Sequence, residues 1–176
     1  MEADLLPMIA VDGARIAYRQ IGKGRPLVVL NGFGATGADW DPCFIDRLAT
    51  SNELILLDNR GIGGSRDQGQ PFDIAKLADD TAHVIETLRI EPASVMGWSM
   101  GGFIAQALAL SYADRIDKLV LLSTDPGGIE ADLASPDAWF ELIDTSGTPN
   151  EQARRLLFLL FQRTPPNLSI ANLATS

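Results

Sequence analysis

The sequence has little histidine and little cysteine: its 176 residues include one of each, His83 and Cys43. A single cysteine cannot form an internal disulfide, which agrees with a reducing compartment, and its small apolar side chain is predicted to be buried. No apolar run approaches the roughly 18 residues that a membrane-spanning helix requires, and acidic residues occupy the N-terminus where a signal peptide is basic. These absences predict a soluble cytoplasmic protein.

Positive charge is also scarce, because 14 Lys and Arg residues stand against 23 Asp and Glu residues, a net charge of −9. The chain has no local basic patch, so it should be repelled by the phosphate backbone of nucleic acids and by anionic membrane surfaces. We therefore expect neither nucleic acid nor membrane as a partner. The length and the hydrophobic content of 46% are sufficient for one sizeable core.

Short apolar runs alternate with amphipathic segments along the chain. Residues 8–20 predict two strands joined by the tight turn Asp12-Gly13, and the segment Asp73–Leu88 predicts a helix capped by Asp73. Near-continuous apolar runs, typical of strands covered on both faces, are Pro26–Leu30, Glu53–Asp58, Ala93–Gly97 and Lys118–Ser123. This alternation predicts an α/β fold with a mostly parallel sheet and helices on both faces.

The stretch Gly97-Trp98-Ser99-Met100-Gly101 matches G-x-S-x-G, the nucleophile elbow, between a predicted strand and a predicted helix. Glycine two positions before and after the serine lets the strand end and the helix start approach each other while Ser99 adopts a strained backbone. The N-terminus of the following helix directs N–H groups toward charge that develops on an attacked carbonyl. A plain glycine-rich turn is the alternative, but the flanking strand and helix favour a nucleophile.

The turn Asn31–Gly37, with the sequence NGFGATG, has two interpretations. Its G-x-G-x-x-G pattern after a strand resembles a dinucleotide-binding fingerprint, with Asp58 near the position of a ribose-binding acid. Acidic residues at positions 39 and 41 oppose this interpretation, because they would repel a pyrophosphate at the following helix. The turn can instead offer the N–H of Phe33 as an oxyanion donor beside the N–H of Met100. The second interpretation is preferred, because one geometry then explains both turns.

A third turn, DNRGIGGS at residues 58–65, follows the next predicted strand. With N-G-F-G before it and G-W-S-M-G-G after it, the sequence resembles the α/β-hydrolase fold family, most closely its small cofactor-free esterases, enol-lactonases and non-haem bromoperoxidase-like hydrolases. The resemblance covers residues 8–124. It implies that residues 1–124 form the N-terminal part of the hydrolase core and that residues 125–176 form the start of a helical cap and an irregular tail.

The resemblance also implies roles for individual residues. Ser99 would be the nucleophile, and the backbone N–H groups of Phe33 and Met100 would form the oxyanion hole. Trp98 and Phe33 would line the substrate pocket. No metal and no organic cofactor is implied.

Further residues would support this site structurally. Asp58 and Arg60 would fix the neighbouring loop through charge-assisted hydrogen bonds, and Gly97 and Gly101 would shape the turn. Many members of the family have histidine where this chain has Asn31, and we expect that difference to matter little.

The chain departs from the family in its catalytic base. The family order is nucleophile, acid and then histidine, but no histidine follows Ser99. His83 is expected on the solvent side of its helix, among Asp79, Asp80 and Glu86. Asp125 is a weak candidate for the acid, because TDPGG is equally a turn signal. The uncharged stretch from Thr164 onwards adds to the expectation that the chain is C-terminally truncated.

The sequence therefore predicts a serine hydrolase that acts on a small carboxylic ester or lactone through an acyl-enzyme on Ser99. Because the base is missing, we expect the isolated chain to be a poor catalyst that forms a homo-oligomer or needs a complementing C-terminal chain. The alternative is a catalytically inactive α/β-hydrolase-like binding module that lacks the histidine of the triad.

Overall fold

The computed structural model describes residues 6–128 and 135–161. The chain divides into two compact units, Met1–Ala131 and Asp132–Ser176. The first unit contains the sheet, and the second contains two helices in the segment where the sequence predicts helical structure. The predicted irregular tail from Thr164 lies outside the described residues.

The first unit is built on a mixed sheet with the strand order β1-β2-β4-β3-β6-β7, and β5 pairs with β2. The strands β4, β3, β6 and β7 are parallel neighbours, which confirms the arrangement predicted for the four apolar runs. The strands β1 and β2 form the predicted antiparallel hairpin. Their bounds are β1 (Met8–Val11), β2 (Ala14–Gly22), β3 (Arg25–Leu30), β4 (Asn52–Leu57), β5 (Arg66–Asp67), β6 (Ala93–Trp98) and β7 (Ile116–Leu122).

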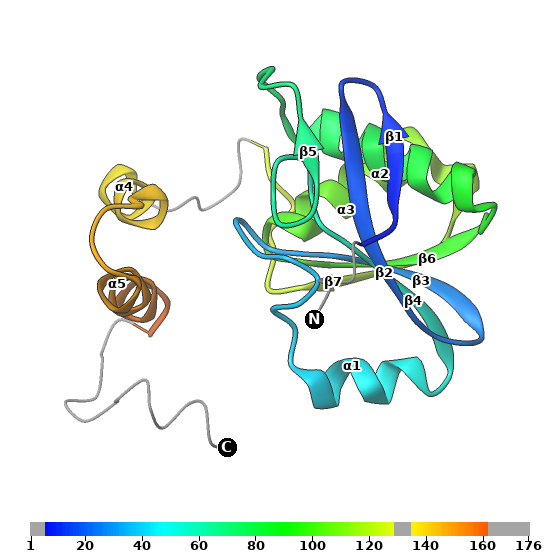
Figure 1. Cartoon of the computed structure of the whole chain (residues 1–176), viewed down its shortest axis with the longest axis horizontal. Coiled ribbons are helices and arrows are strands. Elements are labelled where there is room, and N and C mark those ends of the chain that lie inside the picture. Colours follow the sequence, from blue (N-terminus) through cyan, green and yellow to red (C-terminus); the bar gives the residue numbers. More distant parts are fainter. Residues whose placement is uncertain (1–5, 129–134, 162–176) are drawn as a thin grey trace. The chain divides into compact units, whose positions relative to one another are not determined.

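Helices cover both faces of this sheet, with α1 on one face and α2 and α3 on the other (Figure 1). Alternate residues of a strand point to opposite faces of the sheet. Leu54 and Leu56 of β4 pack in the cluster with Ile45 of α1. Ile55 and Leu57 pack in the larger cluster with residues of α2 and α3. The helices are α1 (Pro42–Ala49), α2 (Ile74–Leu88), α3 (Met100–Ser111), the short 3₁₀ helix η1 (Ala113–Arg115), α4 (Pro136–Ile143) and α5 (Pro149–Phe161).

The helix α2 begins where the sequence predicts. The side chain of Asp73 accepts a hydrogen bond from the backbone N–H of Lys76 at 2.9 Å, which satisfies one of the N–H groups that a helix start leaves without a partner. Its predicted apolar side is buried, with Leu77, Val84 and Ile85 all at 4% exposure or less. The position of α2 against the sheet therefore follows from its hydrophobic period.

Cys43 corrects one sequence prediction, because it is exposed rather than buried. It lies on α1, whose buried contact is made by Ile45. Two residues along a helix correspond to a rotation of about 200°, so a helix that buries position 45 turns position 43 toward solvent.

The strand β7 forms one end of the sheet, since β6 is its only hydrogen-bonded neighbour among the described residues. Leu119, Val120 and Leu121 of β7 are 37%, 42% and 42% exposed. Within the described ranges, no helix has the length and apolar character needed to cross a membrane.

Candidate active site

Ser99 is the single residue between β6, which ends at Trp98, and α3, which begins at Met100. Its backbone has φ 53° and ψ −119°, in a region that residues with a side chain seldom occupy. Three hydrogen bonds hold it there: its N–H donates to Leu122 O at 2.9 Å, and its carbonyl oxygen accepts from Thr124 Oγ1 and from the N–H of Gly102, both at 2.8 Å. The surroundings therefore maintain a strained serine at the carboxyl end of a central strand.

The glycines on each side of Ser99 are required by space. A Cβ atom on Gly97 would overlap the carbonyl oxygen of Gly101, and one on Gly101 would overlap the carbonyl oxygen of Leu30. These contacts are with backbone, which cannot rotate away as a flexible side chain can. The close approach of strand and helix that the motif predicts is thus present in the structure.

The loop Asn31–Gly37, which we call the oxyanion loop, is attached to the loop after β4 by one carboxylate. Asp58 is 1% exposed and accepts hydrogen bonds from the N–H groups of Gly37 and Gly64, both at 2.8 Å. The guanidinium of Arg19 lies 3.4 Å from the same side chain. Asp58 therefore joins the two loops. Both of its carboxylate oxygens already accept backbone hydrogen bonds, whereas a ribose-binding acid needs an oxygen free for the ribose hydroxyl.

Arg60, in the loop after β4, connects this loop to α2 and to the β1–β2 turn. It is 4% exposed, and its Nε and Nη2 donate to the two carboxylate oxygens of Asp80 on α2 at 2.9 and 2.7 Å. Nη2 also donates to the carbonyl oxygen of Asp12 in the β1–β2 turn at 2.7 Å. The hydrogen bond with Asp80 is the main cause that raises the pKa of Arg60 above its usual value. Arg60 thus joins the loop after β4 to α2 and to the β1–β2 hairpin.

We predict that Asp58→Asn destabilises the fold by about 2–3 kcal/mol, because an amide nitrogen would then face a backbone N–H and leave that buried donor unpaired. Urea unfolding followed by circular dichroism measures the change. Asp67→Asn is the matched control, since Asp67 also accepts a backbone N–H, from Gly69 at 2.7 Å, but in an exposed position. Equal effects of the two substitutions would contradict this account of Asp58.

Asn31 has a larger structural role than the sequence suggested. It is fully buried, its Nδ2 donates to Leu57 O, and its Oδ1 accepts from Trp40 Nε1 at 2.6 Å. One amide thus joins the oxyanion loop to β4 and to the indole that precedes α1. The amide carries one donor and one acceptor on the same carbon, and these suit the two different partners.

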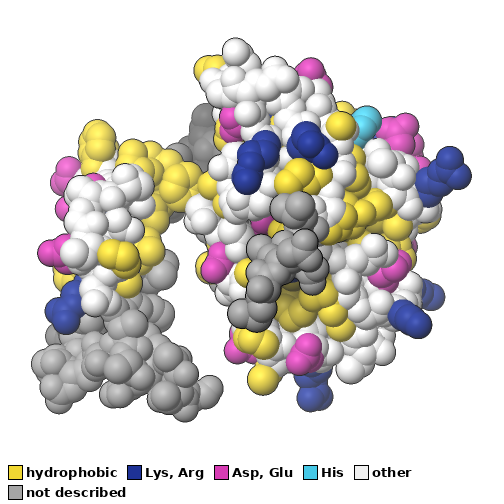
Figure 2. Space-filling view, in the orientation of Figure 1, with side chains coloured by type: hydrophobic (Ala, Val, Ile, Leu, Met, Phe, Trp, Pro, Cys, Tyr) yellow, Lys and Arg dark blue, Asp and Glu magenta, His cyan; other side chains and the backbone are white. Residues whose placement is uncertain are grey.

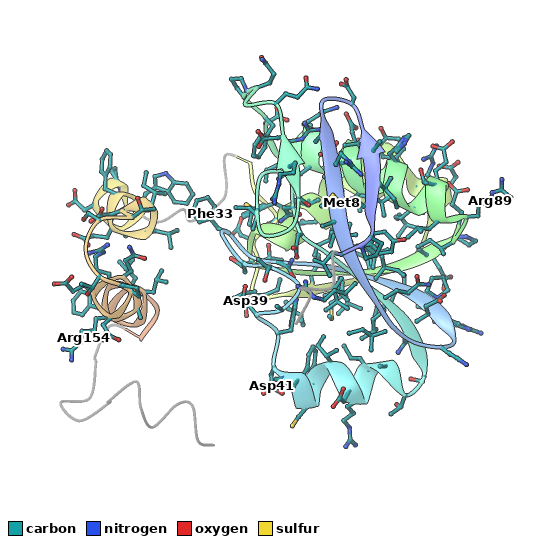
Figure 3. All side chains as sticks on the ribbon, in the orientation of Figure 1. Met8, Phe33, Asp39, Asp41, Arg89 and Arg154 are labelled. Carbon is teal, nitrogen blue, oxygen red and sulfur yellow. The ribbon has the colours of Figure 1, made fainter. Side chains whose placement is uncertain are left out.

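The two predicted pocket residues both reach the surface. Phe33 is 52% exposed and projects from the oxyanion loop (Figure 3). Trp98 is 40% exposed and meets Trp40 edge to face, with ring centroids 5.9 Å apart. Trp40 was not among the residues predicted from the sequence. A tryptophan shortly after a glycine-rich turn was the signal that could have identified it.

The two titratable candidates from the sequence do not pair with each other or with Ser99 in any hydrogen bond of the described residues. His83 is exposed on α2, and Figure 2 shows the histidine side chain on the surface with acidic side chains beside it. It lines a cavity of about 280 Å³ with Asp79 and Glu86, which are exposed as the sequence predicts. Asp80, predicted on the same solvent side, is instead 4% exposed, because it pairs with the buried Arg60. Asp125 accepts a hydrogen bond from Gly127 N–H at 2.7 Å, so its carboxylate stabilises its own turn.

Comparison with known proteins establishes the family. Residues 25–165 match the model of the alpha/beta hydrolase fold, and the chain belongs to the α/β-hydrolase fold family. A protein of Mycobacterium tuberculosis, BpoC, whose name describes a non-heme bromoperoxidase, is 40% identical over 110 residues, which cover 62% of this chain and 42% of the relative. A pimeloyl-acyl-carrier-protein methyl ester esterase of Aeromonas hydrophila is 31% identical over 112 residues, which cover 63% of this chain and 42% of the relative.

Solved structures share the fold over most of the chain. A hydrolase from Pseudomonas aeruginosa superimposes with a TM-score of 0.72 at 28% identity, covering 94% of this chain and 64% of that one. An α/β-hydrolase fold protein from Chitinophaga pinensis gives a TM-score of 0.74 at 31% identity, covering 87% of this chain and 54% of that one. The chain therefore spans less than two thirds of the length of these relatives.

Proposed function

We propose that Ser99 is the nucleophile of a serine hydrolase that cleaves a small carboxylic ester or lactone through an acyl-enzyme. The observation that carries the proposal is the strained backbone of Ser99, with φ 53°, at the junction of β6 and α3. Strain of this kind persists only where neighbouring structure maintains it, and it is concentrated at sites of function. The esterase name among the relatives supports an ester as the substrate class.

In the proposed reaction, Ser99 Oγ attacks the carbonyl carbon and its proton passes to a base. The carbonyl oxygen becomes negative and is stabilised by the N–H groups of Met100 and Phe33. Met100 suits this role because it is the first residue of α3, where the helix offers no acceptor for the N–H. The alkoxide leaves with the proton, and water then attacks the acyl-enzyme, returning Ser99 and releasing the acid.

Among the described residues, no histidine lies at Ser99 to act as the base. The one histidine of the chain is on the exposed side of α2. The proposal therefore requires an imidazole from polypeptide outside these 176 residues, whether a continuation of the chain or a partner. Asp125 remains the candidate for the acid that would orient such an imidazole. The same absence favours the second candidate function, an inactive binding module with the fold of a hydrolase.

Chemical rescue tests this proposal. The 176-residue chain is incubated with an alkyl fluorophosphonate, with and without free imidazole, and the adduct on Ser99 is measured by mass spectrometry. We expect slow labelling that imidazole accelerates about tenfold or more, because a general base contributes about 10²–10⁴ when it is held in place and less when it is free. Ser99→Ala should abolish the adduct, whereas Ser51→Ala, at an exposed serine, should leave it unchanged. Absence of any Ser99 adduct in either condition would favour the binding module.

A further inference from the structure

Beside the oxyanion loop lies a cavity of about 240 Å³, which we call the indole chamber. Its walls include the indoles of Trp40 and Trp98, the side chain of Thr36 and two acidic residues, Asp39 and Asp41. Figure 3 shows Asp39 on the segment between β3 and α1, and Asp41 at the start of α1. The volume lies just below that of common ligand pockets, about 300–1,000 Å³, and suits one ring with a short substituent.

The chamber is held in shape by contacts that do not involve a ligand. Trp40 donates through Nε1 to the buried Asn31 and stacks on Phe44 with ring centroids 5.7 Å apart. Asp39 Oδ2 accepts hydrogen bonds from both the N–H and the hydroxyl of Thr36, at 2.7 and 2.9 Å. Aromatic walls that are fixed in this way lose little conformational entropy when a ring packs against them.

The chamber is adjacent to the nucleophile. A Cβ atom placed on Gly32 would lie 3.0 Å from the ring of Trp98 and 3.5 Å from Cβ of Ser99. The Trp98 ring and the serine side chain therefore both pack close to Gly32. Trp98, the residue that precedes Ser99 in the chain, is therefore the part of the chamber lining nearest to the serine along the sequence.

Charge restricts what the chamber accepts. Its lining contains the carboxylates of Asp39 and Asp41 and no lysine, arginine or histidine. An anionic ligand would meet two like charges without a compensating cation, whereas a neutral ring would meet indole surface. The lining is thus matched to an uncharged aryl group and opposed to a carboxylate.

We propose that the indole chamber binds the uncharged aryl group of an aryl or arylalkyl ester, with Trp98 as its main contact and Asp39 as the residue that excludes anions. The assignment of the aryl group to an ester rests on the proposed function of Ser99. The binding of an aryl group does not, because the chamber requires no reaction at the serine.

Binding to the Ser99→Ala chain tests the chamber independently of the nucleophile. The probes are 4-fluorobenzyl alcohol and 4-fluorobenzoate, titrated against the protein and followed by fluorine NMR. We expect the alcohol to bind at least fivefold more tightly than the benzoate. Trp98→Ala should weaken the alcohol about tenfold, the loss of roughly one aromatic contact. Asp39→Asn, which keeps an acceptor for Thr36, should raise benzoate binding about fivefold and leave the alcohol unchanged.

Phe72→Ala is the matched control, because Phe72 is 45% exposed and lines a different cavity beside the start of α2. It should leave both probes unaffected. The proposal is overturned if neither probe binds, if Phe72→Ala weakens the alcohol as much as Trp98→Ala does, or if benzoate binds as well as the alcohol. Binding of the alcohol together with failure of the fluorophosphonate to label Ser99 would retain the chamber and reject only the proposed hydrolase chemistry.

Discussion

Gly97→Ala is expected to lower the free energy of unfolding by about 4 kcal/mol, at the upper end of single-substitution effects. The new Cβ would overlap the carbonyl oxygen of Gly101 in the first turn of α3. Neither partner can move easily, because Gly97 lies in β6, which is paired with β3 on one side and β7 on the other. Urea unfolding followed by far-ultraviolet circular dichroism measures the loss.

The control for this substitution is Gly69→Ala. Gly69, unlike Gly97, has a positive φ, of 73°, and a Cβ atom there would have nothing within 4 Å. Its cost should be limited to backbone strain, about 1–2 kcal/mol. If Gly97→Ala cost no more than Gly69→Ala, the close approach of β6 and α3 would not be the reason for glycine at position 97.

Removal of one partner from the Arg60–Asp80 pair has the second large expected effect, a loss of about 3–5 kcal/mol for Asp80→Ala or Arg60→Ala. Arg60 is 4% exposed and Asp80 is 4% exposed. Asp80→Ala leaves the buried guanidinium without its carboxylate, and Arg60→Ala leaves Asp80 with only Lys76, whose Nζ is 4.0 Å away. Most of the cost is the desolvation of the remaining charge rather than the loss of attraction.

The double variant Arg60→Met with Asp80→Leu separates these causes. It removes both charges and keeps apolar volume, so it should cost less than either single substitution. Thermal and urea unfolding of the four proteins completes the cycle. A double variant that lost as much as the sum of the two single variants would show that the residues act independently, contrary to this explanation.

The strands, α2 and the serine turn could be predicted because their signals are local. The runs that became β3, β4, β6 and β7 are apolar on both faces, and the cap Asp73 and the apolar side of α2 lie within one segment. The spacing of Gly97 and Gly101 around Ser99 in the sequence is sufficient to predict that the strand and the helix approach closely there. Adjacent positions in the chain were sufficient for each of these predictions.

Other features depend on contacts between distant segments, which periodicity does not encode. Asn31 acquires its role from Leu57 O and from Trp40, and the indole chamber exists only because Trp40 meets Trp98. Cys43 was misjudged because its residue type suggested burial, whereas the helix rotation set by Ile45 exposes it. In each case the folded arrangement overrides residue type.

The single carboxylate of Asp58 joins the oxyanion loop to the loop after β4 through Gly37 and Gly64. Two segments that share one buried anchor behave as one mechanical element, since displacement of either disturbs the same side chain. The entropy of ordering the oxyanion loop is therefore lost when the protein folds and not when a substrate arrives. A polypeptide segment that brought an imidazole to Ser99 would have to order only that one ring, because the oxyanion loop is already rigid.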